Sequence, residues 1–76
     1  MNFEFTLTVP STRNFRAIDL INEYAKNTRG LCVVRDQYFT PYVLKNGVWY
    51  KYDHWRIEQH PENPDLINVT IFMTEK

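Results

Sequence analysis

The chain has 76 residues, and nine lysine and arginine residues balance nine aspartate and glutamate residues, which leaves a formal net charge of zero. The hydrophobic content of 43% is too high for a disordered tail, and a single cysteine, Cys32, excludes both an intrachain disulfide framework and a cysteine-based zinc site. No apolar run approaches the roughly 20 residues that a membrane-spanning helix needs. We therefore expect one soluble domain over residues 1–76, without membrane contact, in a reducing compartment such as the cytoplasm.

The first predicted element is a strand over residues 2–9, in which apolar and polar side chains alternate. A period of two is typical of a strand with one wet face, and it is not the pattern of a secretion signal. Pro10 ends this strand, because proline lacks the backbone N–H group that continues a ladder. The apolar side chains that share one face are Phe3, Phe5, Leu7 and Val9.

A helix is predicted next, from about residue 12 to residue 28, because the apolar spacing changes from two residues to 3.6. Ser11 or Thr12 is the predicted N-cap, and Gly30 is the predicted C-cap glycine. The apolar side chains fall on one arc of the helical wheel, about 160° wide, and polar side chains fill the opposite side. The residues of this arc are Ala17, Ile18, Leu20, Ile21, Tyr24 and Ala25.

Three further segments have the composition of strands. Residues 31–34 are all apolar and closely follow the helix, which predicts a buried strand. Residues 55–59 are a short strand candidate that the pattern leaves open, and the proline-rich stretch at residues 61–65 predicts a loop. Residues 66–74 alternate as cleanly as the first strand, and we expect these two strands to pair near the centre of the sheet, under the helix.

The strongest local signal is Asn46-Gly47, which lies inside the apolar hairpin at residues 42–53. A type I′ turn needs positive φ at both central positions, and asparagine followed by glycine is the preferred pair. A two-residue turn fixes the register and places Leu44 opposite Trp49. Large apolar side chains occur on both faces of this hairpin, so the pattern leaves open which face is buried.

The summed prediction is an α+β domain of two layers, with one helix packed on a four- to five-stranded, mostly antiparallel sheet in the chain order β-α-β-β-β-β. A helix is about 10–12 Å wide with its side chains, whereas five strands at about 4.8 Å spacing span roughly 24 Å. One helix cannot cover such a sheet. Some apolar surface must therefore stay open, be covered by a loop, or meet a partner.

Seven of the twelve aromatic residues lie between residues 38 and 55, which is the most informative feature of the chain. Tyrosine, tryptophan and arginine are enriched at binding hot spots. We therefore predict a non-enzymatic protein-binding module, a regulator or inhibitor that occludes a larger partner, a role also filled by small phage proteins that modulate their host. The predicted contact residues are Tyr42, Leu44, Trp49, Lys51, Trp55 and Arg56.

Two alternatives use the same aromatic side chains. A single-stranded nucleic-acid-binding domain would stack bases on these rings beside basic residues such as Lys45 and Lys51. A net charge of zero argues against this alternative, because phosphate neutralisation dominates nucleic-acid affinity. In the second alternative the chain is a structural homodimer, and the sheets of two copies pair through edges or faces.

The remaining candidates for ligand binding or catalysis are two arginines, two histidines and the cysteine. Arg13 and Arg16 lie at the predicted helix N-terminus and could bind a phosphate or carboxylate, although solvation of both side chains is the simpler interpretation. His54 and His60 have no third nitrogen or sulfur ligand, so no metal is expected. Cys32 is interpreted as a small buried apolar residue. Without paired carboxylates, an activated nucleophile or a ligand cluster, we expect neither an enzyme nor a cofactor.

Overall fold

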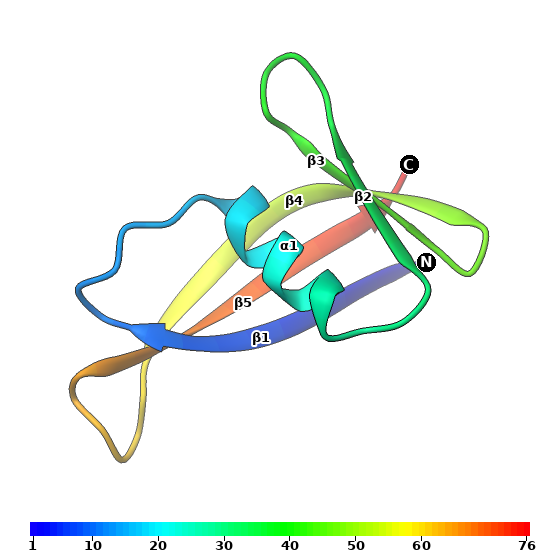
Figure 1. Ribbon diagram of the computed structural model, residues 1–76. Helices are drawn as coiled ribbons and strands as arrows, with labels where there is room; N and C mark the ends of the chain where they lie inside the picture. The colour runs from blue at the N-terminus through cyan, green and yellow to red at the C-terminus, as the bar shows by residue number, and fades with distance from the viewer.

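The computed structural model describes all 76 residues and contains one helix and five strands (Figure 1). Their order along the chain is β-α-β-β-β-β, which confirms the predicted α+β fold class. The ten residues of its one helix are too few to span a membrane. The elements are β1 (Asn2–Pro10), α1 (Ala17–Lys26), β2 (Leu31–Arg35), β3 (Pro41–Lys45), β4 (Val48–Gln59) and β5 (Leu66–Glu75).

All five strands form one antiparallel sheet in the order β1-β5-β4-β3-β2. The first and last strands are neighbours, as predicted, but β1 lies at an edge rather than at the centre, which β4 occupies. The sheet is strongly curled. Phe3 of β1 lies 4.7 Å from the Tyr50 ring of β4, measured between centroids, and 4.6 Å from Nζ of Lys45 in β3, although two strands separate β1 from β3.

The helix α1 packs on the concave face of this curl, in front of β4, β5 and β1 in the view of Figure 1. Leu20 and Ile21 are buried, which confirms the predicted apolar arc. The core between the helix and the sheet includes Val43 and Tyr50, so the face of the β3–β4 hairpin that carries these two residues is the buried one. The buried core residues are Phe5, Val9, Leu20, Ile21, Val43, Tyr50, Val69, Ile71 and Met73.

Both predicted caps of the helix are wrong. The N-cap is Arg16, not Ser11 or Thr12, and its backbone amide donates to Oδ2 of Asp19 at 2.9 Å. The helix starts late because this acidic side chain, three residues after the cap, supplies the acceptor where the apolar arc begins. At the other end the C-cap is Asn27, and Gly30, at φ +82°, lies in the turn that leads into β2.

The strand β2 lies at an edge of the sheet, and the prediction of a buried strand at residues 31–34 is wrong. Val34 is 44% exposed, and Cys32 is also exposed rather than buried. The physical reason is that β2 has only one neighbouring strand, β3, and the helix covers only the concave face. Cys32 and Val34 therefore point away from the core, on the uncovered side of the sheet.

Residues 55–59, which the sequence pattern left open as a strand candidate, are the end of β4, which runs without interruption from Val48 to Gln59. A bulge between Tyr52 and His54 inserts one extra residue opposite β5. Because each residue along a strand alternates sides, this insertion turns Trp55 to the same concave side as Tyr52. The predicted loop at residues 61–65 is confirmed as the connection between β4 and β5.

Candidate functional site

The convex face of the sheet, opposite α1, carries an apolar surface that we call the outer patch, formed by Val34, Tyr42, Leu44 and Trp49. The Asn46-Gly47 turn places Leu44 directly opposite Trp49, as the sequence predicts. The pairing of β2 with β3 adds Val34, which lies opposite Tyr42. Directly opposite residues in antiparallel strands share a face and touch. Residues from three strands therefore make one continuous surface.

A groove of about 190 Å³ crosses the outer patch and is lined by Val34, Tyr42, Trp49 and Lys76. The backbone amide of Lys76 donates to the Trp49 carbonyl oxygen at 3.0 Å, which fixes the chain beside the indole ring. The Lys76 ammonium group lies 5.0 Å from the centroid of the Tyr42 ring. Trp49 is 38% exposed, so one side of the groove presents a large ring to solvent.

The charges at the border of the outer patch are positive. Lys51 lies opposite Tyr42 on the same face, and Lys76 forms one wall of the groove. The carboxylate of Asp36 lies 3.4 Å from the Tyr42 hydroxyl group and is already engaged, because its Oδ1 accepts hydrogen bonds from the backbone amides of Tyr38 (2.8 Å) and Thr40 (2.9 Å). These amide donors, with that of Thr40 foremost, lower the pKa of Asp36 below its ordinary value.

The loop between β2 and β3 presents two more aromatic side chains, Tyr38 and Phe39, which are 79% and 47% exposed. The Asp36 amide donates to the Thr40 carbonyl oxygen, and the Phe39 amide donates to that of Asp36. Phe39 has φ +64°, a left-handed conformation that glycine usually occupies at this position of a three-residue hairpin loop. Guanidinium carbons lie 4.1 Å (Arg35) and 5.4 Å (Arg16) from its ring centroid.

The structure brings together four of the six predicted contact residues, Tyr42, Leu44, Trp49 and Lys51, and separates the other two. Trp55 lies on the concave side, where its ring contacts that of Phe15 at a centroid distance of 5.2 Å. Arg56 faces outward farther along β4, where its guanidinium pairs with Glu58 and lies over the ring of Phe72.

Three surface residues were not singled out from the sequence. Val34 and Lys76 line the groove, and Phe39 forms the rim of the β2–β3 loop. The residues around each of them in the sequence give no signal for this placement. Val34 and Lys76 reach the groove through backbone pairing with Tyr42 and Trp49, and Phe39 is exposed by a turn with positive φ. Only the clustering of aromatic residues along the chain could have pointed to Phe39.

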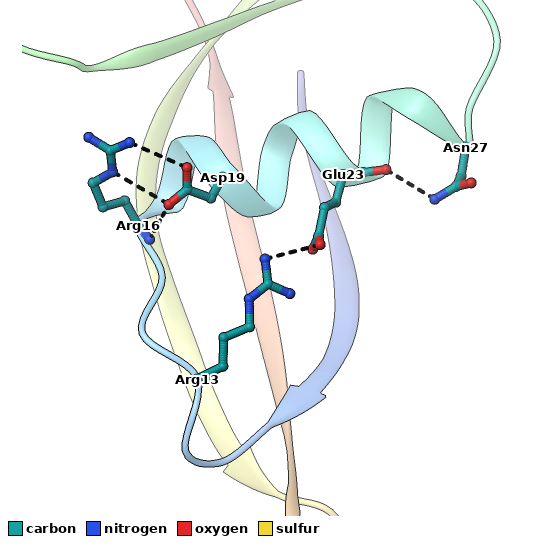
Figure 2. A network of polar contacts seen from close by, with 5 residues as sticks. All are labelled: Arg13, Arg16, Asp19, Glu23 and Asn27. Atoms are coloured by element: carbon teal, nitrogen blue, oxygen red, sulfur yellow. Dashed lines mark hydrogen bonds and ion pairs between the residues drawn. The ribbon is translucent and has the colours of Figure 1, made fainter.

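The two arginines proposed for anion binding are separately neutralised (Figure 2). Arg16 pairs with Asp19, and Arg13 reaches Oε1 of Glu23 at 3.0 Å, one turn farther along the helix. The hydrogen bond from the Arg16 amide, followed by that from its side chain, lowers the pKa of Asp19. The guanidinium groups therefore do not converge on a common point beside the helix N-terminus, and both have carboxylate partners.

The two histidines lie apart. His54 contacts the carboxylate of Asp53 and stacks on Phe72 at a centroid distance of 4.5 Å. Nδ1 of His60 accepts hydrogen bonds from the backbone amides of Glu62 and Asn63 and so organises the loop before β5. The structure contains no group of three or more histidine, cysteine, aspartate or glutamate side chains that could hold a metal ion.

The outer patch is therefore the part of the molecule in which exposed aromatic side chains, aliphatic side chains and unpaired cations meet. No protein-family model matches this chain, and the comparisons with curated proteins and with solved structures gave no match either.

Proposed function

We propose that this protein is a non-enzymatic protein-binding module that acts in the cytoplasm as a regulator or inhibitor, by occluding the surface of a larger protein with its outer patch. The observation that carries the proposal is the bare convex face. The single helix lies on the opposite side of the sheet, while Val34 and Trp49 keep 44% and 38% of their surface exposed beside Tyr42 and Leu44. Contiguous apolar surface of this kind marks interaction sites on soluble proteins.

The patch has the anatomy of a binding hot spot. A large ring, Trp49, stands beside a groove, and smaller aliphatic groups surround it. The side chains project from paired strands, so little conformational freedom is lost when a partner buries them. Lys51 and Lys76 border the patch, and the occupant that fits is a protein surface whose apolar centre has an acidic rim.

The first test is affinity capture from native cells with the wild type and with the Trp49→Ala variant, followed by calorimetric titration with the purified partner. A hot-spot tryptophan contributes 2 kcal/mol or more by truncation, so we expect binding to weaken by about 30-fold. Ile57→Ala is the matched control, because Ile57 is 47% exposed on the same strand but on the concave side. Unchanged affinity of the Trp49→Ala variant would exclude the outer patch as the contact surface.

Salt dependence separates this function from single-stranded nucleic-acid binding. An aromatic-anchored protein interface with two bordering lysines, Lys51 and Lys76, should lose less than about tenfold in affinity between 50 and 200 mM salt. A protein that contacts 6–10 phosphates loses about 10³–10⁵-fold over that range. A steep log-linear loss with captured RNA or DNA would replace the protein-binding proposal with the nucleic-acid one.

A further inference from the structure

The free edge of β2 is the second unpartnered feature next to the outer patch. β2 pairs only with β3, and no residue of the chain pairs with its other side. Edge strands present a row of unpaired backbone groups that can pair with another chain, and natural proteins commonly block them with charges, prolines or covering loops. Most of this edge has no such protection, because it consists of Leu31, Cys32, Val33 and Val34.

The backbone of β2 directs alternate residues toward the free edge. In an antiparallel pair, residues whose N–H and C=O groups bond to the neighbour alternate with residues whose groups point away. The Asp36 amide donates to the Thr40 carbonyl oxygen in the register of the β2–β3 ladder, which places even-numbered residues in the bonded set. The N–H and C=O groups of Leu31, Val33 and Arg35 therefore point outward.

A strand added at this edge would extend both surfaces of the sheet. On the convex side its side chains would lie beside Cys32 and Val34 and continue the outer patch. On the concave side its side chains would lie beside Leu31 and Val33, which are half-buried near α1. An occupant with apolar residues at alternating positions matches both sides, because both rows are apolar.

The charges at the ends of the edge specify the occupant further. Arg29 precedes β2 and Arg35 ends it, and both are exposed, while the carboxylate of Asp36 is held by loop amides. A segment with acidic residues flanking its apolar core therefore complements this edge. A second copy fits less well, because two-fold pairing centred on Val33 would bring Arg35 diagonally next to the second copy's Arg29 at each end, and like charges on neighbouring strands destabilise the pairing.

From the free edge, the outward backbone groups and the flanking arginines, we infer that the partner supplies an extended, acid-flanked apolar segment that pairs with β2 as a sixth strand. This inference rests on the proposed protein-binding function and names the form that the partner takes. The new strand lies directly beside Val34, so strand pairing and the groove at Trp49 form one continuous binding site.

The test uses random peptides of about ten residues, displayed on phage and selected on the full-length protein. The tightest peptide is then synthesised and titrated against three variants, Val33→Pro, Thr6→Pro and Trp49→Ala. Proline at residue 33 removes an outward N–H group and leaves the bonds to β3 in place. Thr6→Pro is the matched control on the other edge of the sheet, which β1 forms. The Ser11 amide donates to the Asp65 carbonyl oxygen, so the backbone groups of the even-numbered residues of β1, native Pro10 included, point to the free side.

The expected result is a peptide with alternating apolar residues and acidic ends, whose binding weakens at least tenfold with Val33→Pro and is unchanged with Thr6→Pro. N-methylation of alternate peptide amides should weaken binding to the same extent, a result that does not depend on the folding of any variant. Alkylation of exposed Cys32 should slow when the peptide is bound.

Failure to select any peptide, or equal binding to the Val33→Pro variant, would overturn the inference. If only Trp49→Ala abolished peptide binding, the proposed function would stand, but strand pairing at β2 would be excluded. If only Val33→Pro abolished peptide binding, the edge of β2 would remain the binding site and the outer patch would be excluded from it. Sedimentation velocity over a range of protein concentrations gives the remaining outcome, since a dimer that Val33→Pro dissociates would assign the edge to a second copy.

Discussion

At the scale of single residues, Phe39 combines strain with exposure. Only Phe39 and Asn46 have positive φ without being glycine, and asparagine tolerates this conformation far better than a bulky ring does. The strain amounts to roughly 1 kcal/mol or more, and the guanidinium groups of Arg35 and Arg16 beside the ring offset part of it. Phe39 therefore keeps a large ring exposed at a backbone position that glycine would occupy with less strain.

The strain at Phe39 predicts an unusual order of stabilities for two small replacements. Both Phe39→Gly and Phe39→Ala remove the ring, but only glycine adopts φ +64° without cost. We expect the glycine variant to be more stable than the alanine variant by about 1 kcal/mol in urea unfolding, the reverse of their order in a helix. Equal stabilities would contradict a left-handed backbone at this residue.

The carboxylate of Asp36 predicts how the stability of the β2–β3 loop depends on pH. Its pKa is lowered in the folded state, first by the Thr40 amide, so its ionised form is the one that stabilises the fold. This contribution is present above the unfolded pKa of about 4 and is lost as pH falls through the lower folded pKa. The wild type should therefore exceed Asp36→Asn in stability by a constant amount above about pH 4.

Thermal unfolding of both proteins at a series of pH values between about 2 and 7 would measure this difference. We expect the advantage of the wild type over Asp36→Asn to shrink steadily below about pH 4. Asp19→Asn serves as a comparison, because the Arg16 amide and side chain lower the pKa of Asp19 in the same direction. A difference that does not vary with pH would mean that the charge of Asp36 plays no part in holding the loop.

At the scale of elements, the β3–β4 hairpin depends on its two turn residues. Gly47 has φ +80°, and a Cβ atom added there would meet nothing within 4 Å, so any cost of substitution comes from the backbone alone. We expect Gly47→Ala to destabilise the protein by about 1–2 kcal/mol in urea unfolding. Asn46→Gly keeps the positive φ accessible and should change stability by less than half as much.

The helix depends on its buried face. Leu20 has no exposed surface and packs between the helix and the sheet, so Leu20→Ala should lower the free energy of unfolding by about 2–5 kcal/mol. Asn22→Ala, on the exposed side of the same helix, should stay within about 0.5 kcal/mol of the wild type. Urea denaturation compares the two variants, and similar losses would contradict this placement of the helix.

Features set by local chemistry could be predicted from the sequence. The helix stripe, the type I′ turn and the register at Leu44 and Trp49 all depend on residues close together in the chain. The environment of β2 could not be predicted, since a short apolar run has the same pattern in a central strand as at an edge. Trp55 was placed with the contact residues although it faces the core, because the bulge after Tyr52 reverses the alternation and leaves no mark in the sequence.

At the scale of the whole molecule, the core and the proposed contact surface lie on opposite faces of one sheet. Leu20 and Ile71 are fully buried on the concave side, whereas Trp49 projects from the convex side. Trp49→Ala should therefore change the free energy of unfolding by less than about 1 kcal/mol while it weakens binding. Urea denaturation of the variant separates the two effects, and a large loss of stability would show that the indole ring supports the fold.

The position of β5 between β1 and β4 has a consequence for how the protein is made. Residues 2–10 are synthesised before the rest of the sheet, but they have no neighbouring strand until residues 66–75 have been synthesised. The β3–β4 hairpin, by contrast, can close as soon as its own turn emerges. Because contacts between distant parts of a chain form slowly, the last step of folding should be the insertion of β5, after translation of the whole sheet is complete.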